Sequence, residues 1–125
     1  MNIVLWIVAI VLAAAFVGAG AMKLLQPKEK LVTDPRMGWA EPFPPNLIRT
    51  IGALEILAAI GLTLPALLDI APILVPLAAT GLVVMMIGAA VTHGRRGETQ
   101  SVVMNLVLLA LAAFVAWGRF GPYAF

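Results

Sequence analysis

One carboxylate, Glu55, stands inside a hydrophobic stretch of the chain, residues 49–65, which reads RTIGALEILAAIGLTLP. An acidic side chain in the middle of a membrane costs about 3 kcal/mol on insertion scales, so it usually faces protein and has a partner or a function. Three other polar residues, Lys23, His93 and Asn105, fall in or beside other hydrophobic stretches. These four are the candidate ligand-binding residues, because ammonium, imidazole and amide groups donate hydrogen bonds and a carboxylate can set the charge or relay a proton.

Several other kinds of chemistry are disfavoured by the residues present. The chain has no cysteine, which excludes disulfides, CxxC redox pairs and thiolate ligands for metals or iron–sulfur clusters. It has one histidine, so two axial ligands for a haem cannot come from a single chain, and a typical zinc site is not expected. GxSxG and HExxH motifs and a phosphate-binding glycine loop are also absent from the sequence. No metal site is therefore predicted, and no catalytic residue is assigned.

The composition indicates an integral membrane protein. Hydrophobic residues make up 62% of the 125 residues and charged residues only 11%, against about 25% charged in soluble domains. A helix of about 20 apolar residues crosses the hydrocarbon core, so the chain has room for four spans and no separate soluble domain. We predict an all-α antiparallel bundle, one domain over residues 1–125, with spans at about 3–25, 47–64, 71–92 and 100–117.

Polar and proline residues suggest where two of these spans begin and end. Asn46 is expected to cap the second span and Pro65 to end it, and Asp69 is a candidate cap for the third. For the first span, a cleaved signal peptide is the alternative, because the small residues at 18–21 resemble a cleavage site. The basic region that precedes a signal sequence is missing and the apolar run is longer than usual, which favours a span.

The first loop, residues 26–45, is rich in charge and proline and carries Trp39 and Phe43. Such aromatic residues commonly lie at the level of the lipid headgroups, which suggests an interfacial loop. A lid over a site beneath it is the alternative. Most basic residues fall in this loop, at its borders or in the loop 93–98, leaving only Arg119 near the termini. The positive-inside rule then predicts that both loops are cytoplasmic and both termini outside.

Folding the spans into hairpins brings the four polar residues into one half of the bilayer. Arg49 is six residues from Glu55, about 120° around a helix, so the two do not share a face. Lys23 is the better candidate partner, because small residues one turn before it allow another helix to approach. Whether these residues form a structural ion pair or a ligand pocket stays open, as does whether His93 faces solvent or the pocket. The glycines expected at helix contacts are Gly20, Gly52 and Gly88.

Five segments in this order resemble the DoxX-like family of small membrane proteins over nearly the whole chain: GAGAMKLLQP, MGWAEP, RTIGALEILAAIGLTLP, PLAATGLVVMMIGAAVTH and a fourth span with Asn105. The resemblance implies a four-helix bundle in which Lys23, Gly52, Glu55, His93 and Asn105 match the family pattern. It also implies varied biochemistry, since relatives include subunits linked to thiosulfate:quinone oxidoreduction, partners in membrane redox complexes and a distant assembly chaperone for receptors.

Two functional hypotheses follow. The first is a redox-associated membrane protein whose intramembrane polar pocket binds a lipophilic small molecule such as a quinone. The second is a non-catalytic assembly or scaffold subunit in which the polar residues fix helix register and recognise a partner. A small transporter is less favoured, because no inverted repeat is evident. Besides the bilayer, the candidate partners are a membrane or redox protein and a second copy of the chain; nucleic acid is not expected.

Overall fold

The protein is described by a computed structural model that covers residues 1–33, 35–40 and 42–125, and it is built on four long helices. The long helices are α1 (Asn2–Leu25), α3 (Pro45–Leu67), α4 (Leu74–Arg95) and α5 (Thr99–Phe120). Each has 22 to 24 residues and is apolar enough to span a membrane. At 1.5 Å per residue they are about 33–36 Å long, against about 30 Å of hydrocarbon. The predicted all-α bundle of four membrane-spanning helices is confirmed.

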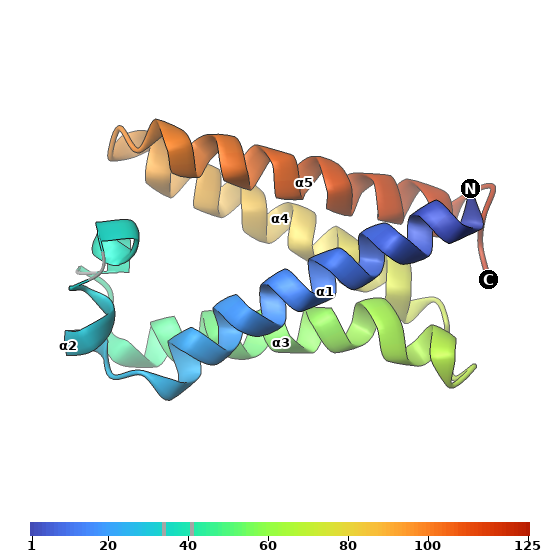
Figure 1. Ribbon diagram of the computed structural model, residues 1–125, viewed down its shortest axis with the longest axis horizontal. Coiled ribbons are helices and arrows are strands. Elements are labelled where there is room, and N and C mark those ends of the chain that lie inside the picture. The colour runs from blue at the N-terminus through green and yellow to red at the C-terminus, as the bar shows by residue number, and fades with distance from the viewer. Residues whose placement is uncertain (34, 41) are drawn as a thin grey trace.

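The long helices form two antiparallel pairs, α1 with α3 and α4 with α5, and α3 also packs against α4. Figure 1 shows both termini together at one end of the molecule, which we call the terminal end. The opposite end, the loop end, carries α2 (Lys28–Leu31) and the 3₁₀ helix η1 (Pro35–Ala40). There the two pairs diverge, and the ribbon of η1 lies between them (Figure 1).

Two hydrophobic clusters hold these elements. The larger cluster fills the bundle from its middle toward the terminal end, and its buried members are Leu12, Phe16, Ala59, Leu62, Val75, Ala79, Leu82, Met86, Ala112 and Val115. The smaller cluster is at the loop end, where the buried side chains Leu31, Met37, Ala40 and Ile48 pack α2 and η1 onto the start of α3. The first loop is therefore anchored to the α1–α3 pair.

Two glycines set the distance between α1 and α3. A Cβ atom placed on Gly20 would lie 2.5 Å from the carbonyl oxygen of Gly52, and one on Gly52 would lie 2.8 Å from that of Gly20. Real Cβ contacts are not this short, so any larger residue at either position must push the helices apart. The small-residue contact expected between these two helices is present in the fold.

The prediction that Pro65 ends the second span is wrong, because α3 continues to Leu67. A proline inside a helix removes one backbone hydrogen bond, but the following turn still closes. The helix ends where Asp69 takes a positive φ of 52° and the amide of Ile70 donates to the carbonyl of Pro65.

The expected helix caps are also wrong. Helix α3 begins at Pro45, ahead of Asn46, since a proline is well suited to the first helical position. Helix α4 begins at Leu74, after the predicted start at 71, because Ala71 has a positive φ of 46°. Ile73 occupies the N-cap position of α4, so Asp69 does not cap it.

Candidate functional site

A cavity of about 410 Å³ lies between the two helix pairs toward the loop end. All four candidate ligand-binding residues line it, and each comes from a different long helix: Lys23 from α1, Glu55 from α3, His93 from α4 and Asn105 from α5. The volume falls within the roughly 300–1,000 Å³ of small-molecule sites. The fold therefore brings together the four residues that the sequence singled out, while their binding of a ligand stays a prediction.

Lys23 and Glu55 form a buried ion pair, with Lys23 Nζ 2.7 Å from Glu55 Oε1. The two glycines explain why these residues meet, because Lys23 follows Gly20 and Glu55 follows Gly52 by three positions, the spacing of one helix face. Side chains on a helix lean toward its N-terminus, so in an antiparallel pair these two lean toward each other. The predicted partner of Glu55 is confirmed, and Arg49 is exposed instead.

The ion pair leaves hydrogen-bonding capacity unused. Besides Lys23 Nζ, Glu55 Oε1 has no polar partner among the described residues. An ammonium group carries three N–H donors, and a carboxylate oxygen carries two lone pairs. The pair is thus close enough to neutralise charge in the membrane and still has donors for a molecule in the cavity.

Asn105 is buried on the opposite helix pair, with 9% of its surface exposed. Its Nδ2 has no hydrogen-bond partner in the described parts of the chain. A buried polar group without a partner costs about 1–3 kcal/mol. Because Asn105 lines the cavity, water or a bound molecule there is positioned to reduce that cost.

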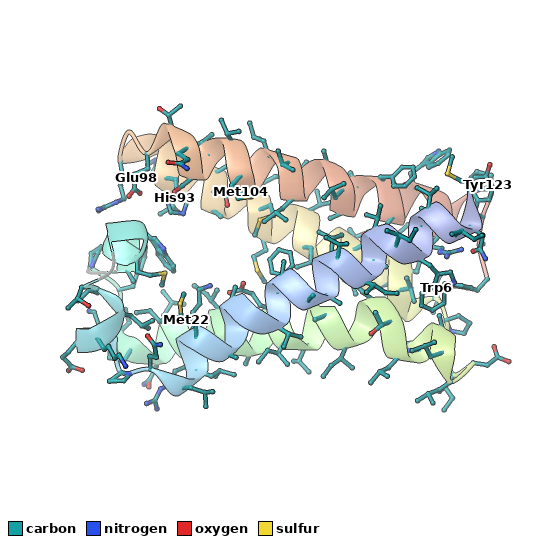
Figure 2. All side chains as sticks on the ribbon, viewed as in Figure 1. Trp6, Met22, His93, Glu98, Met104 and Tyr123 are labelled. Atoms are coloured by element: carbon teal, nitrogen blue, oxygen red, sulfur yellow. The ribbon has the colours of Figure 1, made fainter. Side chains whose placement is uncertain are left out.

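His93 is held at the loop end by contacts with the α4–α5 turn and with η1. Its Nδ1 lies 2.9 Å from Glu98 Oε1, and Arg96 Nε donates to the same oxygen at 3.1 Å. The hydrogen bond with His93 and the charge of Arg96 hold the pKa of Glu98 below its usual value. The rings of Trp39 and His93 pack in a T-shaped arrangement with their centroids 6.2 Å apart, and the histidine side chain is only 12% exposed. Of the two open alternatives, the structure places His93 at the cavity; Figure 2 shows its position beside Glu98.

The first loop contributes two aromatic side chains to the cavity wall. Trp39, from η1, and Phe43, just after it, both line the cavity, and their ring centroids lie 6.0 Å apart. This arrangement agrees with a loop that covers a site. The wall residues that the sequence did not single out are Ala15, Phe16, Ala19, Ile51, Met85, Met86, Ala89, Thr92 and Leu108. Among these wall residues, only the pair Met85 and Met86 could have been noticed in the sequence, because flexible methionine side chains are common at adaptable binding surfaces.

Gly88 does not have the environment that was expected of it. A Cβ atom there would meet no heavy atom within 4 Å, so this glycine does not set a helix–helix distance as Gly20 and Gly52 do. It lies at the cavity wall instead. Its small size keeps the space beside α4 open, and a larger side chain could enter that space without a clash.

Comparison with known proteins places the chain in a family. The family model described as the DoxX-like family matches residues 7–115, a range that includes all four polar cavity residues. No curated protein and no solved structure matches the chain. The chain belongs to the DoxX-like family.

Proposed function

We propose that this membrane protein of the DoxX-like family binds, in the cavity at its loop end, a lipophilic small molecule with a polar head, such as a quinone. The observation that carries the proposal is the composition of the cavity wall. Apolar and aromatic side chains form most of it, and Lys23, Glu55, His93 and Asn105 reach it from four helices. A largely apolar cavity with a few convergent polar groups is typical of small-molecule sites.

The polar groups have complementary roles in this proposal. Lys23 keeps N–H donors beyond its contact with Glu55 and would donate to a carbonyl oxygen of the head. Asn105, from the other helix pair, would orient the head through its amide, which lacks a protein partner. His93, whose Nδ1 faces Glu98, would accept a hydrogen bond at Nε2 from a hydroxyl group of the head, at the end of the cavity near η1. Glu55 would balance the charge of Lys23 and could relay a proton to the bound head as the quinone is reduced.

The redox association is part of the same proposal and depends on a second component. The chain has no cysteine, so thiol chemistry of its own is excluded. Electrons would reach a bound quinone from a membrane redox protein. The residues of this chain would bind the quinone and relay protons to it as it is reduced.

A single-tryptophan reporter tests the binding directly. The chain has three tryptophans, of which Trp39 lines the cavity, while Trp6 and Trp117 belong to the first and last helices near the termini. In a Trp6→Phe/Trp117→Phe protein in nanodiscs, a short-chain quinone should quench Trp39 with a saturable curve. Glu55→Gln in the same background should shift or weaken that saturation, because Lys23 loses its counter-charge.

The matched control keeps Trp117 and carries Trp6→Phe and Trp39→Phe. Partition of the quinone into the bilayer quenches this reporter without saturation. If Trp39 gave the same unsaturable quenching as Trp117, and Glu55→Gln changed nothing, the proposed site would be refuted.

A second candidate function is a non-catalytic assembly or scaffold subunit, and the buried Lys23–Glu55 pair favours it because such pairs can fix helix register. Under this alternative, Glu55→Gln lowers thermal stability or recovery of a partner and leaves quinone quenching of Trp39 unsaturable. Purification from native membranes without any recurrent partner argues against it.

A further inference from the structure

A second, smaller pocket lies at the loop end, where α1, α2 and the start of α3 meet. Its volume is about 20 Å³, and it is lined by Lys23, Gln26, Lys28, Leu31, Pro45, Ile48 and Arg49. Three of these side chains are cationic, one is an amide, and none is acidic. This composition suits an anion.

The cations are held in place by the fold. Gln26 follows the last residue of α1, Lys28 is the first residue of α2, and Arg49 lies in the second turn of α3. The buried side chains of Leu31 and Ile48, each 2% exposed, pack α2 against α3 and fix the distance between the two helices. The positive groups therefore converge because of the first loop's own hydrophobic cluster.

Two of the positive charges at this pocket form no salt bridge with an acidic side chain in the part of the chain that the structure describes. Lys23 is neutralised by Glu55 on the cavity side. Among the residues that the structure describes, neither Lys28 nor Arg49 is in a salt bridge with an acidic side chain. Guanidinium and ammonium groups are the usual ligands of phosphate in proteins, and arginine binds two of its oxygens at once.

The position and size of the pocket narrow the ligand further. It lies where α1 ends at Leu25 and α3 begins at Pro45, which is the depth expected for lipid headgroups. A water-sized probe needs about 10–15 Å³, so a pocket of this size holds about one oxygen atom, such as one oxygen of a phosphate group that lies at its mouth, and not a nucleotide. The geometry points to a site for a single phosphate group, held by Lys28, Arg49 and Gln26. The phosphate belongs either to a membrane phospholipid or to inorganic phosphate.

Native mass spectrometry of the full chain released from detergent tests this assignment. The protein is equilibrated with phosphatidylglycerol, with diacylglycerol, which lacks the phosphate, or with inorganic phosphate. The variant Lys28→Gln/Arg49→Gln removes two charges from the pocket. Lys30→Gln/Arg95→Gln removes two from exposed residues of the same end outside it and serves as the matched control.

We expect phosphatidylglycerol to bind to the wild type and diacylglycerol not to bind. Each removed cation should weaken phosphatidylglycerol binding about fivefold, so the affinity of the pocket variant should fall about 25-fold and that of the control variant should change little.

Competition distinguishes the two sources of phosphate. Displacement of the lipid by millimolar inorganic phosphate would identify free phosphate as a ligand, and retention of the lipid would identify the phospholipid. Equal losses in the two variants would overturn the assignment, because they would indicate general surface attraction. The melting temperatures of both variants verify that they are folded. If the cavity binds quinone as proposed, saturable quenching of Trp39 in both variants is a second check of folding.

Discussion

The two ends of this bundle differ in whether their buried polar side chains have hydrogen-bond partners within the protein. At the terminal end, Arg119 is 4% exposed and is bonded to protein: its Nη1 donates to Asn2 Oδ1 at 2.6 Å and to the carbonyl of Tyr123 at 2.9 Å. The rings of Phe125 and Trp6 lie 4.0 and 5.9 Å from its guanidinium carbon. Figure 2 shows Trp6 and Tyr123 at this end. Arg119 thus ties the two terminal segments together.

At the loop end, polar side chains of similar burial surround a cavity. Asn105 has an amide nitrogen without a partner among the described residues, and the Lys23–Glu55 pair keeps spare donors. The difference follows from helix packing, because the pairs are close at one end and apart at the other (Figure 1). A satisfied polar group points to a structural role, and an unsatisfied one beside a cavity points to a ligand.

The largest effect on stability should come from Lys23→Met. This change leaves Glu55 buried without its partner, which typically costs about 3–5 kcal/mol. The melting temperature in detergent should fall strongly, and Trp39 should lose its saturable quenching. The double variant Lys23→Met/Glu55→Leu, which removes both charges, should recover most of the stability but not the binding. A double variant as unstable as Lys23→Met would contradict the ion-pair account.

Arg119→Gln should be the largest change at the terminal end. It removes charge-assisted hydrogen bonds worth about 1.5–3 kcal/mol and the contacts with two aromatic rings. The melting temperature should fall, while quinone quenching of Trp39 should keep the wild-type midpoint. A shifted midpoint would show that the two ends are not independent.

Gly52→Ala should destabilise the protein by about 1–3 kcal/mol, because the added methyl overlaps the carbonyl of Gly20 and the Cβ of Lys23. Gly81→Ala is the control, since a Cβ there meets nothing within 4 Å. Thermal unfolding of both variants in the same detergent makes the comparison. Equal stability of the two would refute the close contact of α1 with α3.

Asn105→Leu should separate binding from stability. The apolar side chain removes the unsatisfied amide, so the melting temperature should stay the same or rise, while quinone affinity should fall about tenfold. Trp39 quenching measures the affinity. A large loss of stability would indicate that Asn105 has a structural role like that of Arg119.

The smallest effect concerns pH at the α4–α5 turn. The pKa of Glu98 is lowered by its hydrogen bond with His93, so its stabilising contribution is present above the ordinary carboxyl pKa and is lost as pH falls through the folded value. Between about pH 5 and pH 3 the wild type should lose slightly more stability than Glu98→Gln. Melting temperatures of the two proteins across that pH range test this. An equal loss of stability in both would contradict a stabilising contact between Glu98 and His93.

The sequence predicted the parts of the fold that depend on local pattern. Apolar runs located the four spans, and the small residues one turn before Lys23 identified it as the partner of Glu55. Helix ends were harder, since the path after Pro65 is decided by the positive φ of Asp69 and Ala71.

The cavity wall could not be predicted, because it depends on how far the helix pairs diverge. Gly52 and Gly88 look alike in sequence, yet one lies at a helix contact and the other beside open space. The cytoplasmic location of the two loops, the quinone and the redox partner stay predictions.

The central claim is that the loop end of the bundle is open for a ligand, and Gly88→Leu tests it most directly. Gly81→Leu is its control: both glycines are exposed on α4, seven residues apart and therefore on nearly the same face, and neither Cβ would clash. Only Gly88 lines the cavity. Quinone quenching of the Trp39 reporter should lose its saturation in Gly88→Leu and keep the wild-type midpoint in Gly81→Leu, at unchanged melting temperatures. Wild-type saturation in Gly88→Leu would contradict the account.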